Sequence, residues 1–227
     1  MKIHRTILAL ALLVMTSRTL PARTIDWGSA VGDSLLTSSG LMLDSTFTFE
    51  LGTFGSFVPS EFNLDLWLAN WKVFDRATAP AANGWDPALG FVSGSATLQT
   101  NGTSSNLTVP PNIFAQGEQA YIWVYNGFTI DSLTEWALVT NNGSDGNALD
   151  DWIMPAHADQ TAQPLDWRLS NAAQVPFGGL KDVEGPGDYT VIPPSFELQT
   201  HTVPEPGSAL LIGLAGLVFQ FRRRLRR

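Results

Sequence analysis

The chain of 227 residues contains no cysteine. This absence excludes disulfide bonds, metal sites built on thiolates and cysteine nucleophiles. A folded domain of this chain must therefore be stabilised by its core alone, or by its core together with bound ions.

Catalytic sequence motifs are also missing. The chain has no G-x-S-x-G nucleophile motif, no H-E-x-x-H zinc motif and no phosphate-binding glycine loop. His157 and Asp159 could share a metal, although a loop histidine is more often simply solvated. Two carboxylates across a cleft can hydrolyse a glycan, but the sequence does not identify such a pair. We expect a non-catalytic protein, with a carbohydrate-active enzyme as the alternative.

Basic residues are scarce between the two ends of the chain. Eight of the 13 lysines and arginines lie in residues 1–22 and 222–227, and Glu205 is the one acid outside residues 23–203. Residues 23–203 therefore hold five basic and 20 acidic residues, a net charge of −15. Phosphate backbones repel such a surface, so we expect no nucleic-acid partner. Cations, or a neutral or cationic glycan, fit better, and the charge also favours solubility outside a cell.

Long hydrophobic runs are absent, and the two short ones lie at the ends. Lys2 and Arg5 precede a nine-residue apolar stretch, residues 7–15, that is too short to cross a bilayer. Pro21-Ala22 then offers a small residue for cleavage. This order is typical of a secretory signal peptide, which we predict over residues 1–22 with cleavage after Ala22. The secretion translocon and signal peptidase are the partners that it implies.

The second apolar run, residues 207–221, has only Ser208 and Gln220 as polar members. A helix of fifteen residues would be roughly 22 Å long, against a hydrocarbon core of about 30 Å. It is therefore short for a permanent anchor, although arginine side chains that reach outward close part of the gap. The basic cluster that follows stays on the cytoplasmic side, which places the preceding domain outside. The cluster consists of Arg222, Arg223, Arg224, Arg226 and Arg227.

The last 25 residues resemble the PEP-CTERM sorting signal. The motif Pro204-Glu205-Pro206, a Gly/Ala/Leu-rich stretch and a terminal arginine cluster follow one another in the order of that family. The resemblance implies a Gram-negative-type bacterium that makes extracellular polysaccharide. It also implies processing at or near the motif by a membrane-embedded protease of the exosortase class. The sorting segment then covers residues 203–227, and its apolar helix over 207–221 would be a temporary inner-membrane anchor; the alternative is an ordinary permanent single-pass anchor.

Residues 23–202 suit one extracytoplasmic domain. Residues 44–51 alternate between apolar and polar and predict a half-buried strand, whereas residues 119–126 are apolar on both faces and predict a central one. Gly94 indicates a bulge within a strand over 91–100. Further strands are expected over residues 134–140, which could pair with 119–126, and over 166–169, 189–192 and 196–203.

One segment, residues 59–76, reads differently. Leu64, Trp67, Leu68 and Trp71 are spaced as one face of a helix, and Ser60 is a suitable N-cap. Partial alternation over residues 62–68 leaves a strand as the alternative. Short strands with one amphipathic helix predict a mainly β fold, an antiparallel β-sandwich of jelly-roll type.

Two features of this domain bear on ligands. Eight tryptophans lie between positions 27 and 167, and we expect most of them in the core, with one or two free to stack on sugars. Residues 141–151 gather amides and carboxylates with bending glycines, as a calcium loop would, although the EF-hand spacing is absent. A polar surface loop is the alternative. The candidate calcium ligands are Asn142, Asp145, Asn147, Asp150 and Asp151.

Together these features predict an exported protein that is held briefly in the inner membrane, processed, and then associated with extracellular polysaccharide at the cell surface or in the matrix. The alternatives are a secreted carbohydrate-active enzyme and a structural or assembly subunit without a small ligand.

Overall fold

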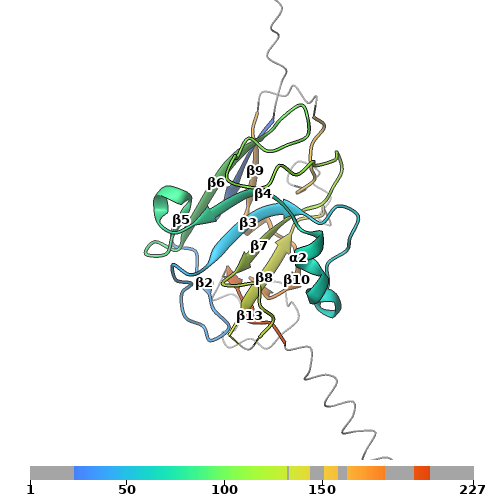
Figure 1. The fold of residues 1–227 in the computed structure, drawn as a ribbon. Coiled ribbons are helices and arrows are strands. Elements are labelled where there is room, and N and C mark those ends of the chain that lie inside the picture. The colour runs from blue at the N-terminus through green and yellow to red at the C-terminus, as the bar shows by residue number, and fades with distance from the viewer. Residues whose placement is uncertain (1–22, 132, 144–150, 158–162, 182–196, 205–227) are drawn as a thin grey trace, which may run out of the picture.

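The computed structural model describes residues 23–131, 133–143, 151–157, 163–181 and 197–204 (Figure 1). The fold is mainly β, as predicted, and the described residues form three sheets, one short α-helix and three short 3-10 helices. The predicted signal peptide, the C-terminal apolar helix and the strand at 189–192 lie outside the described residues.

The largest sheet has six strands: five follow the order β10-β8-β7-β3-β4, and β13 also pairs with β8. All of its pairs are antiparallel. The strands are β3 (Thr48–Thr53), β4 (Lys72–Thr78), β7 (Ala120–Tyr125), β8 (Glu135–Thr140), β10 (Gln174–Phe177) and β13 (His201–Thr202).

Two smaller sheets complete the β structure. The four-stranded sheet has the order β5-β6-β1-β9, and the three-stranded sheet has the order β11-β12-β2. The β1–β9 and β12–β2 pairs are parallel, a departure from the purely antiparallel expectation. The strands are β1 (Arg23–Gly28), β5 (Trp85–Asp86), β6 (Phe91–Leu98), β9 (Leu165–Arg168), β2 (Leu35–Leu36), β11 (Gly179–Leu180) and β12 (Leu198–Gln199).

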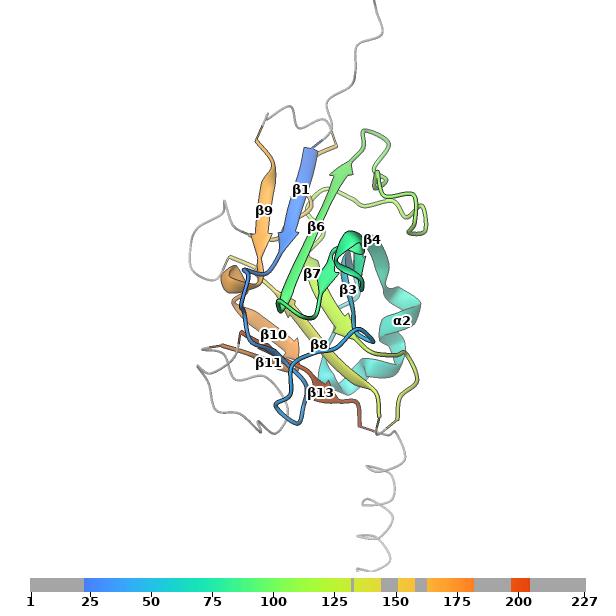
Figure 2. The ribbon, with the colours of Figure 1, turned by 90° about the vertical axis from the view of Figure 1, so that its left-hand side faces the viewer.

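The main core lies between the four-stranded and six-stranded sheets (Figure 2). Because side chains alternate along a strand, Ile122 and Val124 of β7 enter this core, while Trp123 and Tyr125 point to the opposite face. That opposite face carries a second, aromatic cluster. It is partly covered by the 3-10 helix η1 (Glu61–Leu66) and the α-helix α2 (Trp67–Asn70), which contribute Leu64 and Trp67.

The helical segment is shorter than residues 59–76. Helix α2 ends at Asn70, Trp71 adopts an extended conformation, and Lys72–Thr78 forms β4 against β3. Residues 72–76 were therefore wrongly placed in the helix. Leu64 and Trp67 are buried as predicted, whereas Leu68 is 53% exposed. The expected N-cap region forms, with the Ser60 N–H donating to Asn63 Oδ1 over 2.9 Å.

The predicted strands over residues 44–51, 91–100, 119–126, 134–140 and 166–169 correspond to β3, β6, β7, β8 and β9. Strand β7 is central and pairs with β8, as expected. The last predicted strand is divided into β12 and β13, which join different sheets. Strands β1 and β10 were not predicted.

The bulge predicted at Gly94 is wrong, because β6 pairs with β1 in unbroken register from Ser93 to Leu98. Gly94 lies opposite Trp27, and a Cβ there would lie 2.2 Å from the indole Nε1. Glycine is therefore required so that the Trp27 ring can cross the strand. Seven of the eight tryptophans are fully buried, as expected for the core, and Trp71 is partly buried.

Candidate functional site

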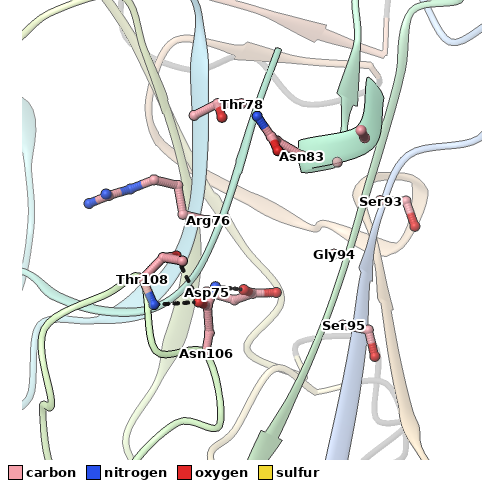
Figure 3. Close-up of a pocket in the computed structure, with 11 residues that line it drawn as sticks. Asp75, Arg76, Thr78, Asn83, Ser93, Gly94, Ser95, Asn106 and Thr108 are labelled. Atoms are coloured by element: carbon pink, nitrogen blue, oxygen red, sulfur yellow. Dashed lines mark hydrogen bonds between the residues drawn. The ribbon is translucent and has the colours of Figure 1, made fainter. Parts of the chain in front are cut away.

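A polar cleft of about 580 Å³ lies between β4 and β6, that is, between the two larger sheets. Figure 3 shows Ser93, Gly94 and Ser95 on one side, Asp75 with Asn106 on the other, and Thr78 and Asn83 toward one end. The lining residues are Asp75, Arg76, Thr78, Ala82, Asn83, Gly84, Ser93, Gly94, Ser95, Asn106 and Thr108.

Asp75 is directed into this region by a β-bulge in β4. Leu51 pairs with Asp75 and Gly52 with Val73, so Phe74 is the extra residue. A bulge of this kind places consecutive side chains on one face. Phe74 accordingly belongs to the main core, and the neighbouring Asp75 bonds to Trp27 of the same core.

The Asp75 carboxylate is 4% exposed and bonded through both oxygens. Trp27 Nε1 donates to Oδ2 over 2.7 Å, and Asn106 Nδ2 donates to Oδ1 over 2.6 Å. Asn106 Oδ1 in turn accepts from the backbone N–H and the hydroxyl of Thr108 (Figure 3). Asp75 therefore positions the loop that forms one wall of the cleft. With both oxygens engaged, it is poorly placed to act as a general acid or base.

The groups left to meet a ligand are uncharged. Asn83 is exposed on the cleft wall and offers its amide group, and Thr78 lies beside it with its hydroxyl. The Ser93 and Ser95 side chains point away from Asp75 in Figure 3, so β6 lines the cleft with its backbone. The Arg76 side chain points away from them in Figure 3, and its Nε bonds to Glu50 Oε1 over 2.6 Å. Among the described lining residues Asp75 is the one carboxylate, and none is aromatic. Such a surface suits a hydroxyl-rich, uncharged ligand.

Sequence reasoning missed this cleft. Asp75 lies in the segment that was predicted to be a helix, and the other walls come from β6, the turn at residues 81–84 and the loop at 104–108. The only local signal was the Asn106-Leu107-Thr108 pattern, whose Asn side chain bonds to the residue two positions later.

The predicted calcium loop is described only at its ends. Asp145, Asn147 and Asp150 lie outside the described residues, Asn142 is exposed, and Asp151 is partly buried. Among the residues that the structure describes, Asp151 Oδ1 is buried without a hydrogen-bond partner, and it lies against Gly143. Within the described part of the chain no cluster of three metal-ligating side chains occurs. Calcium binding by this loop stays a prediction.

The two histidines between residues 23 and 203 both contact neighbouring groups of the fold. His157 is partly buried, and its Nε2 bonds to the carbonyl of Phe114. Asp159, the proposed partner for a metal, lies outside the described residues. His201 is buried in β13 opposite Trp136 and packs its ring against Phe177.

The C-terminal junction is the second site that the structure describes. Strand β13 pairs with β8, and the Val203 N–H then donates to the Thr134 carbonyl over 2.8 Å. Val203 is 1% exposed within the aromatic cluster, whereas Pro204 is exposed. The folded domain therefore reaches the first residue of the Pro-Glu-Pro motif without a spacer. Glu205, Pro206 and the five tail arginines lie outside the described residues.

No helix in the described ranges is long and apolar enough to cross a membrane. The predicted span over 207–221 is not among those residues.

Comparison with curated proteins and with solved structures finds no match. The family model of the PEP-CTERM protein-sorting motif matches residues 202–227. The match begins at Thr202, where β13 ends, and covers the motif, the apolar run and the arginine cluster. The chain thus carries a C-terminal PEP-CTERM protein-sorting motif, which indicates an exported protein that is processed by an exosortase.

Proposed function

We propose that this protein is a non-catalytic surface or matrix component, which binds the polysaccharide of the producing cell through the cleft between β4 and β6. The observation that carries the proposal is the amide of Asn83 and the hydroxyl of Thr78 on the cleft walls, in the same cleft as a carboxylate already bonded twice. These groups can hydrogen-bond to sugar hydroxyls, and they add no charge that would require a charged partner.

The electrostatics of the domain support the same ligand class. A net charge of −15 over residues 23–203 opposes acidic polymers and leaves a neutral or cationic glycan, or a glycan bridged by cations. Seven tryptophans are buried, so aromatic stacking is not the main source of affinity in the described domain. Hydrogen bonding without stacking gives modest affinity per site, which suits a protein displayed in many copies on an insoluble matrix.

The test is co-sedimentation of the exported, processed protein with the insoluble extracellular polysaccharide of the producing organism. Calcium is present in one arm and a chelator in the other. Binding that is lost with the chelator would assign a calcium ion to the 141–151 loop. Absence of binding in both arms would contradict the proposal and favour an assembly subunit, which should self-associate without a ligand, or a carbohydrate-active enzyme.

The cleft is tested by the double variant Asn83→Ala, Thr78→Ala, which removes the amide and the hydroxyl at one end of the cleft. Each lost hydrogen bond is worth about 1 kcal/mol, which is roughly fivefold in affinity, so the pair should weaken binding by about 25-fold. The matched control is Ser170→Ala, Asn171→Ala, which removes the same two groups from the exposed turn η3 (Leu169–Asn171). Equal binding by both variants would show that the glycan does not occupy the cleft.

A further inference from the structure

The β7–β8 loop, residues 126–134, displays apolar side chains to solvent. Leu133 is 82% exposed and Phe128 is 41% exposed. Phe128 also lies on the edge of the aromatic cluster, with its ring centroid 4.3 Å from that of Tyr125. Ile130 is partly buried against the same cluster. The apolar surface of the loop is therefore continuous with a rigid core.

Hydrogen bonds hold the loop in this shape. Asp131 Oδ1 accepts from the backbone N–H groups of Leu133 and Thr134, both over 2.9 Å. Asn126 Nδ2 donates to the Leu133 carbonyl over 3.1 Å, and Asn126 Oδ1 accepts from the Glu135 N–H over 2.8 Å. These hydrogen bonds fix the turn in a conformation that exposes Leu133 to solvent. An exposed apolar side chain next to an aromatic cluster marks a candidate contact surface.

The chain leaves the domain beside this loop. The Val203 N–H bonds to the carbonyl of Thr134, the residue that follows Leu133. Figures 1 and 2 both show the β7–β8 loop at the end of the molecule where β13 ends, and the loop after β6 at the opposite end. Three residues separate Val203 from Gly207, where the apolar run begins, so the two are four residue steps apart. An extended chain covers at most about 14 Å in four residues.

We propose that Phe128 and Leu133 contact the lipid bilayer surface while residues 207–221 hold the protein in the membrane. The short link keeps the β7–β8 loop within reach of the interface, where aromatic and aliphatic side chains are favourably placed. The contact is hydrophobic, because a domain with a net charge of −15 is repelled by anionic headgroups. The inference rests on membrane retention by the C-terminal segment and is independent of polysaccharide binding.

Because the chain has no cysteine, an introduced cysteine is the single site that a thiol-reactive dye can label. Leu133→Cys is labelled with an environment-sensitive dye in the chain that retains its C-terminal segment. The labelled chain is reconstituted into phosphatidylethanolamine–phosphatidylglycerol vesicles, with and without brominated lipid. The control is Leu107→Cys, a 94% exposed leucine in the loop after β6. We expect a shift to shorter emission wavelength and loss of intensity with brominated lipid at position 133, and neither change at position 107.

Equal behaviour of the two positions on vesicle-bound protein would overturn the inference. Shielding of position 133 only when the processing protease is present would also overturn it, and would assign the surface to that enzyme. A labelled chain that does not sediment with vesicles would refute the inference together with its premise of membrane retention. Failure of the co-sedimentation with polysaccharide would leave the inference untouched, which separates the two proposals.

Discussion

Trp27 Nε1 donates a 2.7 Å hydrogen bond to Asp75 Oδ2, and this bond joins β1 of the four-stranded sheet to β4 of the six-stranded sheet. Both residues are almost fully buried. Because Asp75 also holds Asn106, the same carboxylate that links the two sheets fixes one wall of the cleft. Stability and binding are therefore coupled at this position.

Asp75→Ala should lower the free energy of unfolding by about 3 kcal/mol, because the buried indole N–H of Trp27 and the partly buried amide of Asn106 lose their acceptor. Denaturation in urea measures the change. The control is Asp166→Ala, whose side chain is 59% exposed and forms an ion pair with the partly exposed Arg168. That change should stay within about 0.5 kcal/mol. Similar losses in both variants would show that the bond between the sheets contributes little.

Gly94→Ala should also destabilise the fold, because the added methyl group would meet the Trp27 ring 2.2 Å away. Overpacking of a core costs about 1–3 kcal/mol. Gly117→Ala is the comparison, since Gly117 has a φ of +86° and no atom within 4 Å of a Cβ. Its cost is backbone strain alone, about 1–2 kcal/mol. A thermal melt in which Gly94→Ala matches the wild type would contradict the assigned role of Gly94.

The stability of the protein should fall in alkaline solution. Burial of the phenol, together with the negative charge of Glu50, raises the pKa of Tyr125 above its ordinary value. The folded state therefore retains the proton where the unfolded chain has lost it. This stabilisation is fully present below the unfolded-state pKa of about 10 and is lost as the pH rises toward the folded-state value, by up to about 1.4 kcal/mol per pH unit.

Tyr125→Phe tests this assignment. Urea titrations between pH 8 and pH 11 should show a shallower decline of the unfolding free energy for the variant than for the wild type. Burial also raises the pKa of Tyr121, so part of the decline should persist. Parallel curves for variant and wild type would show that Tyr125 does not carry the effect.

Replacing Arg222, Arg223, Arg224, Arg226 and Arg227 with glutamine should impair membrane retention or processing, because these cations keep the C-terminal end in the cytoplasm. Intact-mass measurement of the exported wild-type protein should show a mature form that lacks Phe219–Arg227, and this form should be reduced in the tail variant. The control is Arg168→Gln, Lys181→Gln, which removes cations from the folded domain instead. Normal processing of the tail variant would refute the predicted topology.

An element of this fold could be predicted where the sequence pattern of its own segment fits only one type of secondary structure. Residues 119–126 are apolar on both faces, and only a central strand buries both, so β7 was predictable. Residues 59–76 carry a helical and an alternating pattern at once. The division at Trp71 follows from tertiary contacts, since the Trp71 ring packs on Phe54 and covers the space that Gly52 leaves open.

The candidate cleft could not be predicted for a related reason. Its groups come from β4, β6 and two turns, and each group is an ordinary polar residue in its own segment. The buried pair of Trp27 and Asp75, 48 positions apart, brings these segments together. No periodicity or spacing within one segment encodes a contact of that range.

The sequence by itself determined the sorting signal, because its motif, apolar run and arginine cluster are contiguous and act through composition and order. It also determined the mainly β class and the central strand. Alternating apolar and polar residues predict a strand that is buried on one face, and a short continuous apolar run predicts a strand that is buried on both. The tertiary structure decided where the helix ends, why Gly94 is a glycine, and that the fold extends to Val203, directly before the motif. These outcomes depend on packing between distant segments, where a neighbouring ring or strand overrides local preference.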